Sequence, residues 1–114
     1  MSLERIIKTL EGFGLNRTDA EVYIYLAKKG PLSIGEVAAA LKLSTQKLYH
    51  ILKSLQDKGI VIINLGHPTL FSALPLDEVL ELYIIVNARQ AQVIKENKAE
   101  LLASWRSIIE ENNT

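Results

Sequence analysis

The 114-residue chain contains no cysteine. That absence excludes a disulfide framework and a thiolate metal site, and it is typical of intracellular proteins. Long hydrophobic segments are also missing, because the longest apolar runs, IVII at 60–63 and LYIIV at 82–86, are far too short to span a bilayer. The N-terminal residues show no signal-peptide pattern. We therefore expect a cytoplasmic protein that does not contact a membrane.

Catalytic and metal-binding patterns are missing as well. The sequence has no Ser-His-Asp or Cys-His arrangement in a plausible context, no H-E-x-x-H motif and no phosphate-binding P-loop. The two histidines, His50 and His67, do not have the spacing of metal ligands. We expect a protein that is not an enzyme and that holds neither a metal nor a cofactor.

The chain carries no net charge, but its charges are unevenly spread. Residues 1–73 hold nine Lys or Arg against six Asp or Glu, whereas residues 74–114 hold four against seven. Between residues 28 and 58 there are six lysines and only two acidic residues. This imbalance predicts a moderately basic surface in the first part of the chain, although an excess this small also arises by chance.

Apolar residues recur at helical spacing in four segments of the first 58 residues. The first lies near residues 3–10 and ends before two glycines. Two capping boxes, Thr18 with Glu21 and Ser33 with Glu36, predict where the second and third helices begin. The fourth helix, residues 45–58, has one apolar face made by Leu48, Ile51, Leu52 and Leu55.

After Gly59 the pattern changes from helix to strand. Residues 60–65 are rich in β-branched side chains, 66–69 are typical of a turn, and 70–74 read as a returning strand. From Leu76, after Pro75, the sequence has no Gly or Pro and predicts one long helix to the end of the chain. The fold class is thus mainly α with a small β-hairpin, with a winged helix-turn-helix domain at 1–74 and a long helix for dimerisation at 75–114.

The long helix carries an apolar stripe that needs a partner. The simplest partner is the same helix of a second chain, packed as a coiled coil in a homodimer. A fold-back into two shorter helices near Asn87 or Asn97 is the alternative. The predicted dimerisation residues are Leu80, Ile84, Ala91, Ile94, Leu101, Trp105 and Ile108.

Helix, tight turn, helix and hairpin is the order of a winged helix-turn-helix, in which the second helix enters the major groove of DNA. Such a recognition helix needs a second face of hydrogen-bonding side chains, and 45–58 has one. Gln46 lies near its N-terminal end, where a glutamine can bind adenine with two hydrogen bonds. The members of this face are Gln46, Tyr49, His50 and Lys53. A merely solvated face, and a Tyr49 packed at the margin of the core, are the competing interpretations.

Other residues of the same region suit the DNA backbone. Thr45, Lys47 and Lys53 have the hydroxyl and ammonium groups that bind phosphates without reading sequence. Ser44 is placed to cap the helix and to leave backbone amides near a phosphate. His67, in the predicted wing, is a further candidate contact. These residues complete the predicted DNA-binding set.

The sequence resembles the TrmB-like transcriptional regulators, a mainly archaeal family, from about residue 14 to about residue 81. The resemblance is carried by Ala20-Glu21-Val22-Tyr23, by Lys47-Leu48-Tyr49 with Leu52 and Leu55, by Lys58-Gly59, and by Gly66 and Pro68 before Phe71 and Pro75. It implies a DNA-binding repressor or activator that dimerises through the helix after the wing. We expect a short form without the sugar-binding effector domain of longer members. The sequence departs from the family pattern at Thr45-Gln46 and at His67, where family members often have basic residues.

The leading hypothesis is therefore a sequence-specific regulator that binds double-stranded DNA as a homodimer, with 45–58 in the major groove and 60–74 on the flanking backbone or minor groove. The alternative is a winged-helix module that binds a protein without specific DNA binding. A small-molecule effector is a third hypothesis, for which Tyr83, Ile84 and Trp105 are candidate walls.

Overall fold

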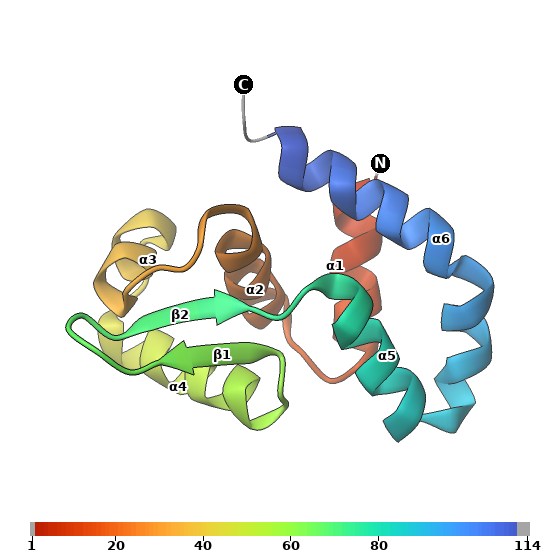
Figure 1. The fold of residues 1–114 in the computed structure, drawn as a ribbon, viewed down its shortest axis with the longest axis horizontal. Coiled ribbons are helices and arrows are strands. Elements are labelled where there is room, and N and C mark those ends of the chain that lie inside the picture. The colour runs from red at the N-terminus through yellow and green to blue at the C-terminus, as the bar shows by residue number, and fades with distance from the viewer. Residues whose placement is uncertain (1, 112–114) are drawn as a thin grey trace. The chain divides into compact units, whose positions relative to one another are not determined.

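The computed structural model describes residues 2–111. It has six helices and one hairpin in those residues, and they form two compact units (Figure 1). Residues 16–74 form the winged unit; the described parts of 1–15 and 75–114 form the helical unit. The elements in chain order are α1 (Ser2–Gly12), α2 (Arg17–Lys29), α3 (Ile34–Leu41), α4 (Thr45–Asp57), β1 (Val61–Asn64), β2 (Leu70–Ala73), α5 (Leu76–Val86) and α6 (Ala88–Glu111).

The capping box predicted for the second helix is wrong. Asn16, not Thr18, caps α2: its side chain accepts a hydrogen bond from the backbone N–H of Asp19 at 2.8 Å, and the Asp19 carboxylate accepts one from the Asn16 N–H at 3.1 Å. Asn is as good a cap as Ser or Thr, so α2 begins two residues earlier and Thr18 lies in its first turn. Glu21 instead pairs with Arg17 on the helix surface.

The box predicted for the third helix is confirmed. The Ser33 side chain accepts from the Glu36 N–H, and the Glu36 carboxylate accepts from the Ser33 N–H. The helix ends at Lys42, which has a left-handed backbone with φ 57° and lets the chain turn at once toward α4. This short connection sets α3 against α4, the two helices of the helix-turn-helix.

The predicted hairpin is also confirmed. β1 and β2 pair antiparallel with Val61 opposite Ala73 and Asn64 opposite Leu70. On its other side β2 exchanges two backbone hydrogen bonds with Leu32, through Phe71, at 2.7 and 3.0 Å. In the described residues β1 pairs only with β2, so the other edge of β1 is the outer edge of this small sheet.

Buried side chains hold the hairpin against the helices of the winged unit. Leu48 and Leu55 from α4 are fully buried, as is Ile60, which leads into β1. Tyr23 of α2 is also fully buried, and its hydroxyl donates a 2.6 Å hydrogen bond to the carbonyl of Leu74, just after β2. The core therefore ties α2 and α4 to the base of the hairpin, where β1 begins and β2 ends, and this fixes the wing relative to α4.

The helical unit departs from the single long helix that the sequence predicts. The helix breaks at Asn87, with φ −127° and ψ 87°, and α6 packs back on α5 and on α1. A long C-terminal helix is present, but it begins at Ala88, and the alternative with a break near Asn87 is the one observed. The break occurs because α1 offers apolar side chains that cover α6 within the same chain: Ile6, Ile7 and Leu10 are buried.

Polar contacts reinforce this fold-back. Arg5 on α1 pairs with Glu100 on α6 at 2.5 Å and donates to the Asn97 side chain at 2.8 Å. Lys98 on α6 pairs with Glu81 on α5. As a result α1 belongs to the helical unit, whereas the division predicted at residue 74 counts it with the winged part. The assignment of separate roles to 1–74 and 75–114 stays a prediction.

Candidate nucleic-acid interface

Helix α4 is held in the winged unit by one face and exposes the other. Ser44 begins it as the cap, and its hydroxyl accepts from the Lys47 N–H at 3.1 Å, as predicted. The predicted apolar face is buried: Leu48, Ile51, Leu52 and Leu55. Because these residues fix the rotation of the helix about its axis, the opposite face must point to solvent.

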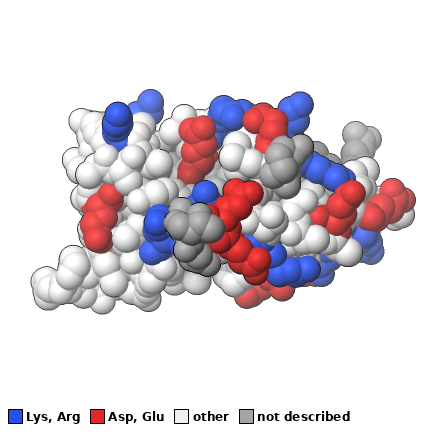
Figure 2. Space-filling model, turned by 90° about the horizontal axis from the view of Figure 1, so that it is seen from above, with Lys and Arg blue, Asp and Glu red and all other residues white. Residues whose placement is uncertain are grey.

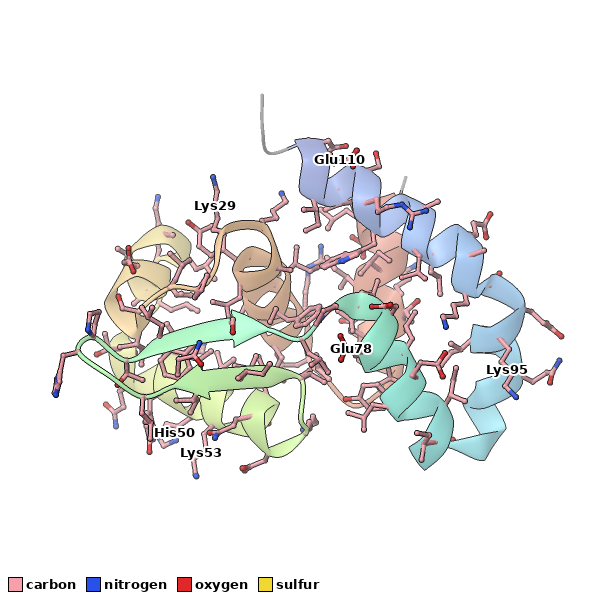
Figure 3. All side chains as sticks on the ribbon, in the orientation of Figure 1. Lys29, His50, Lys53, Glu78, Lys95 and Glu110 are labelled. Carbon is pink, nitrogen blue, oxygen red and sulfur yellow. The ribbon has the colours of Figure 1, made fainter. Side chains whose placement is uncertain are left out.

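The four polar residues of the predicted recognition face lie together on that exposed side. Gln46, Tyr49, His50 and Lys53 follow the i, i+3, i+4, i+7 spacing of one helix side, and all four are exposed. Figure 3 shows His50 and Lys53 projecting from the same side of α4. Tyr49 is 54% exposed and its ring meets that of His50 edge to face, with centroids 5.7 Å apart. Tyr49 is thus exposed rather than part of the buried apolar face, and its role in DNA binding stays a prediction.

The first turn of α4 is equally accessible. Ser44, Thr45 and Lys47 are all exposed. The N-terminus of a helix carries a partial positive charge and favours a phosphate group. Lys47 adds a full positive charge within this turn. The structure therefore brings together all seven predicted DNA-binding residues between 44 and 53.

The wing presents a different kind of surface. Its tip carries the exposed His67, the eighth predicted residue, and Leu65, which is 88% exposed. Ile62 on β1 is 44% exposed. Residues 59–74 contain no Asp, Glu, Lys or Arg, so the wing has no permanently charged side chain. The basic residues of the winged unit are therefore on its helices and the turns between them.

The charge of the winged unit is weakly positive. Residues 16–74 hold seven Lys or Arg and four Asp or Glu. Part of the positive charge is engaged within the unit, since Arg17 pairs with Glu21 and the Lys58 ammonium donates to the Ser54 hydroxyl. Figure 2 is seen from above, the side away from the one toward which Lys53 projects in Figure 3, and on this face basic and acidic side chains are intermixed. Any affinity for phosphate must come from a few positions.

The residues predicted for dimerisation are mostly covered within the single chain. Leu80, Ile94, Leu101, Trp105 and Ile108 are buried, and Ile84 is half-buried. The side chain of Ala91 lies outside the described part of the structure. The apolar stripe on the last helix therefore has a partner in α1 and α5 of the same chain, as the fold-back alternative allows, although the sequence did not single out α1 as part of that partner. Dimerisation stays a prediction.

The helical unit also contains features that no sequence pattern indicated. The rings of Phe13 and Tyr83 stack with centroids 4.0 Å apart. The Tyr83 hydroxyl is buried without a hydrogen-bond partner, and desolvation by burial raises the pKa of Tyr83. An aromatic pair 70 residues apart in the chain leaves no local spacing signal, so only the fold reveals it.

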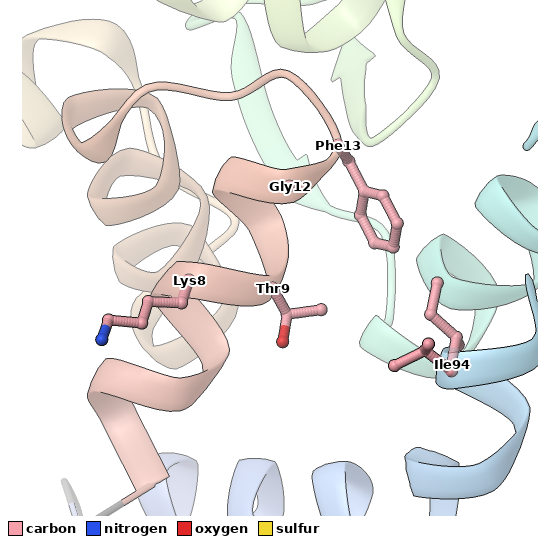
Figure 4. A pocket seen from close by; sticks show the side chains of 6 residues that line it. Lys8, Thr9, Gly12, Phe13 and Ile94 are labelled. Atoms are coloured by element: carbon pink, nitrogen blue, oxygen red, sulfur yellow. The ribbon is translucent and has the colours of Figure 1, made fainter. Parts of the chain in front are cut away.

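A hollow of about 230 Å³ lies between α1 and α6, and Figure 4 shows Phe13 and Ile94 on opposite sides of it. Its lining residues are Lys8, Thr9, Gly12, Phe13, Val93 and Ile94. None of the predicted effector walls, Tyr83, Ile84 and Trp105, lines it. A small-molecule effector stays a prediction.

No described helix is both long enough and apolar enough to cross a membrane. No group of three or more His, Cys, Asp or Glu side chains in the described part of the chain is arranged to hold a metal ion.

Comparison with solved structures gives the fold. The chain resembles a possible transcriptional regulator from Methanosarcina mazei with a TM-score of 0.58, and the match covers 88% of both chains. The two sequences are only 16% identical, so this likeness concerns the arrangement of the elements alone.

Comparison of sequences gives the family. The chain is 33% identical over 78 residues to the HTH-type sugar sensing transcriptional regulator TrmBL1 of Pyrococcus furiosus, covering 68% of this chain and 23% of that protein. It is 27% identical over 115 residues to the DNA-binding HTH-type transcriptional repressor TrmBL2 of Thermococcus kodakarensis, covering 96% of this chain and 44% of that protein. The chain thus spans less than half the length of either relative.

The family model described as sugar-specific transcriptional regulator TrmB matches residues 10–77. This segment includes the whole winged unit, with its helix-turn-helix and its hairpin. The agreement of family model, relatives and fold leads to one conclusion: the chain belongs to the TrmB family of transcriptional regulators.

Proposed function

We propose that the protein is a sequence-specific DNA-binding regulator that acts as a homodimer, with α4 in the major groove. The observation that carries this proposal is the exposed polar face of α4, which stands opposite a fully buried apolar face. An α-helix held this way fits the width of the major groove and can meet base edges with its exposed side chains. The names of the relatives, which include a DNA-binding repressor, support it.

The residues of this face have different roles. Gln46, in the first turn, is placed to read a base edge, since glutamine can pair with adenine through one acceptor and one donor. Lys47 and Lys53 bind phosphates and set the register of the helix, with Thr45 as an additional donor. The Ser44 hydroxyl is already engaged with the Lys47 N–H, so its contribution is to organise this first turn.

A homodimer gives two copies of α4, and two recognition helices about 34 Å apart read a pseudo-palindromic site on one face of the duplex. The wing then lies on the flanking backbone or in the minor groove. His67 is its candidate polar contact.

A second function is supported by the wing itself. Because residues 59–74 have no charged side chain and Ile62 and Leu65 are exposed, this hairpin suits an apolar contact with another protein. In this alternative the winged unit is a protein-interaction module without specific DNA binding.

Salt dependence separates the two functions. Fluorescence anisotropy is measured with a duplex from upstream of the protein's own gene and with a scrambled duplex, across a salt series. A DNA-binding regulator loses affinity steeply as salt rises, because each phosphate contact releases counterions. Lys53→Ala should reduce the slope of log K against log salt by about 1 per contact removed. Gln46→Ala should instead reduce the preference for the native duplex.

Lys29→Ala is the matched control, because Lys29 is an exposed lysine of the same unit that lies at the end of α2 rather than on α4 (Figure 3). It should change neither the slope nor the preference. Equal effects of Lys29→Ala and Lys53→Ala would contradict a reading face on α4. Binding to neither duplex, nor to pooled genomic fragments, would favour the protein-interaction module.

A further inference from the structure

The tip of the wing carries the most exposed large apolar side chain of the described residues. Leu65 is 88% exposed, compared with 44% for Ile62 on β1. A single exposed leucine is common on protein surfaces, so its meaning depends on where it lies. In Figure 1 the tip of the hairpin, between β1 and β2, projects past the helices of the winged unit. Leu65 is therefore accessible to a narrow recess of a partner.

The direction of the chain places this tip toward the end of the winged unit where α4 starts. α4 ends at Asp57, and Gly59, with φ 81°, lets the chain reverse. The Ile60 N–H donates to the Leu55 carbonyl at 3.0 Å, which closes this turn. β1 contacts α4 and runs back along it, as Figure 1 shows. A duplex held by the first turn of α4 is long enough to reach the wing, since one helical turn of DNA spans about 34 Å.

The absence of charge limits what the tip can contact. Residues 59–74 contain no Asp, Glu, Lys or Arg, so the wing neither forms a permanent ionic contact with phosphates nor repels them. In a groove of DNA this leaves the sugars and the base edges as contacts. Asn64, exposed beside Leu65, has an amide that can donate to the acceptors of the minor groove. Gly66, on the other side of Leu65, has no side chain to hold the backbone away from the groove.

The size of the exposed apolar surface favours a groove of DNA over a protein partner. A stable protein interface buries about 800 Å² on each side. In the described wing, Leu65 and Ile62 are the only large apolar side chains that are exposed, and Ile62 is less than half exposed. The minor groove is about 6 Å wide, which suits a single side chain from the tip of a hairpin. Leucine is one of the apolar residues that proteins insert into this groove.

We infer that Leu65 enters the minor groove beside the site of α4 and selects A·T pairs there by excluding the amino group of guanine. This inference rests on the proposed function and adds a specificity-determining residue to it. A·T pairs present only acceptors in the minor groove, whereas a G·C pair adds the guanine N2 amino donor. A leucine packed against that donor removes its water without offering a hydrogen bond, which costs binding free energy. Because leucine is uncharged, this preference does not depend on salt.

Inosine tests this preference directly, because it keeps the major-groove groups of guanine and lacks the N2 amino group. Fluorescence anisotropy is measured with the upstream duplex, in which short blocks of flanking base pairs are replaced in turn by A·T, G·C or I·C pairs. At the block that the wing contacts, the A·T and I·C duplexes should bind equally and the G·C duplex about tenfold more weakly. Leu65→Ala should remove this difference and weaken binding to the A·T duplex about tenfold, with an unchanged salt slope.

Leu3→Ala is the matched control, because Leu3 is an exposed leucine of α1, outside the winged unit. It should change neither the affinity nor the preference at the flanking block. Lys53→Ala is the reciprocal control: it should reduce the salt slope and keep the preference for A·T and I·C over G·C. Circular dichroism spectra equal to that of the unchanged protein show that the variants fold.

The outcomes separate this inference from the function on which it rests. If every flanking block binds equally, or if I·C behaves as G·C does, Leu65 does not read the minor groove and the inference is wrong. The major-groove role of α4 then still stands if Gln46→Ala reduces the preference for the native duplex. A protein that binds no duplex overturns both and favours a protein as the partner of the wing. A G·C penalty that I·C relieves and that Leu65→Ala removes establishes the contact.

Discussion

Replacing Tyr23 by Phe tests whether a single partly buried hydrogen bond holds the end of the wing to α2. Tyr23 is fully buried, and its hydroxyl donates to the Leu74 carbonyl at 2.6 Å. The Phe ring fills the same space, so no cavity forms, but the carbonyl loses a partner. A hydrogen bond contributes about 0.5–1.5 kcal/mol net, and an unpaired buried acceptor costs about 1–3 kcal/mol. We expect the winged unit to lose about 1–2 kcal/mol of unfolding free energy.

Urea denaturation followed by circular dichroism measures this loss. With a slope of about 1–3 kcal/mol per M, the midpoint should fall by roughly 0.5–1 M. Tyr49→Phe is the matched control, because Tyr49 is exposed and the same atom is removed from it; its effect should stay within about 0.5 kcal/mol. If Tyr23→Phe and Tyr49→Phe had the same midpoint, the bond to Leu74 would contribute nothing and our account of how the wing is anchored would be wrong.

Three further predictions use the same measurement. Gly30→Ala should lower the free energy of unfolding by about 1–3 kcal/mol, because a Cβ at this position would lie 2.6 Å from the Leu26 carbonyl oxygen. Gly35→Ala should raise it by up to about 1 kcal/mol, because a Cβ there meets open space and Ala favours helix α3. Equal effects of the two substitutions would contradict this steric argument. Ser44→Ala should lower the free energy of unfolding by about 1 kcal/mol, because the N-terminal cap of α4 is lost. Ser44→Asp should keep the cap and its stability but weaken DNA binding, because its carboxylate repels phosphate. An equal loss of stability in both variants would show that the cap is not the cause. Burial raises the pKa of Tyr83, so the folded state keeps the phenolic proton to higher pH than the unfolded state does, and the free energy of unfolding should fall as pH rises above the ordinary pKa of 10.0. Tyr83→Phe should make this fall less steep. An unchanged pH profile in the variant would show that other groups cause the fall.

Local sequence signals predicted the winged unit well because its elements are short and each has a boundary signal. The Ser33–Glu36 box and Ser44 fix two helix starts, and the apolar face of α4 fixes which residues face solvent. The error at α2 arose because both Asn16 and Thr18 are capping residues with an acidic residue three positions later. Only the observed hydrogen bonds to Asp19 decide between them.

The helical unit was harder to predict for a physical reason. An apolar stripe shows that a helix needs a partner, but it does not say whether the partner belongs to the same chain. The break at Asn87 has only a weak signal in the sequence, because neither Gly nor Pro marks it, although Asn and the β-branched residues 84–86 before it are weaker helix formers than the residues that follow. It depends on long-range packing between α6 and α1, whose contacting residues Arg5 and Asn97 are 92 positions apart.

The outer edge of β1 has a consequence for how the protein behaves in solution. Sheets usually protect such an edge with lysine, proline or a covering segment, and Val61–Asn64 contains neither lysine nor proline. With Ile62 and Leu65 exposed beside it, the edge can template a strand of another molecule. A ligand that covers the wing would block this route. Storage with a bound partner should therefore delay aggregation. Ile62→Lys should delay aggregation even in the absence of a partner.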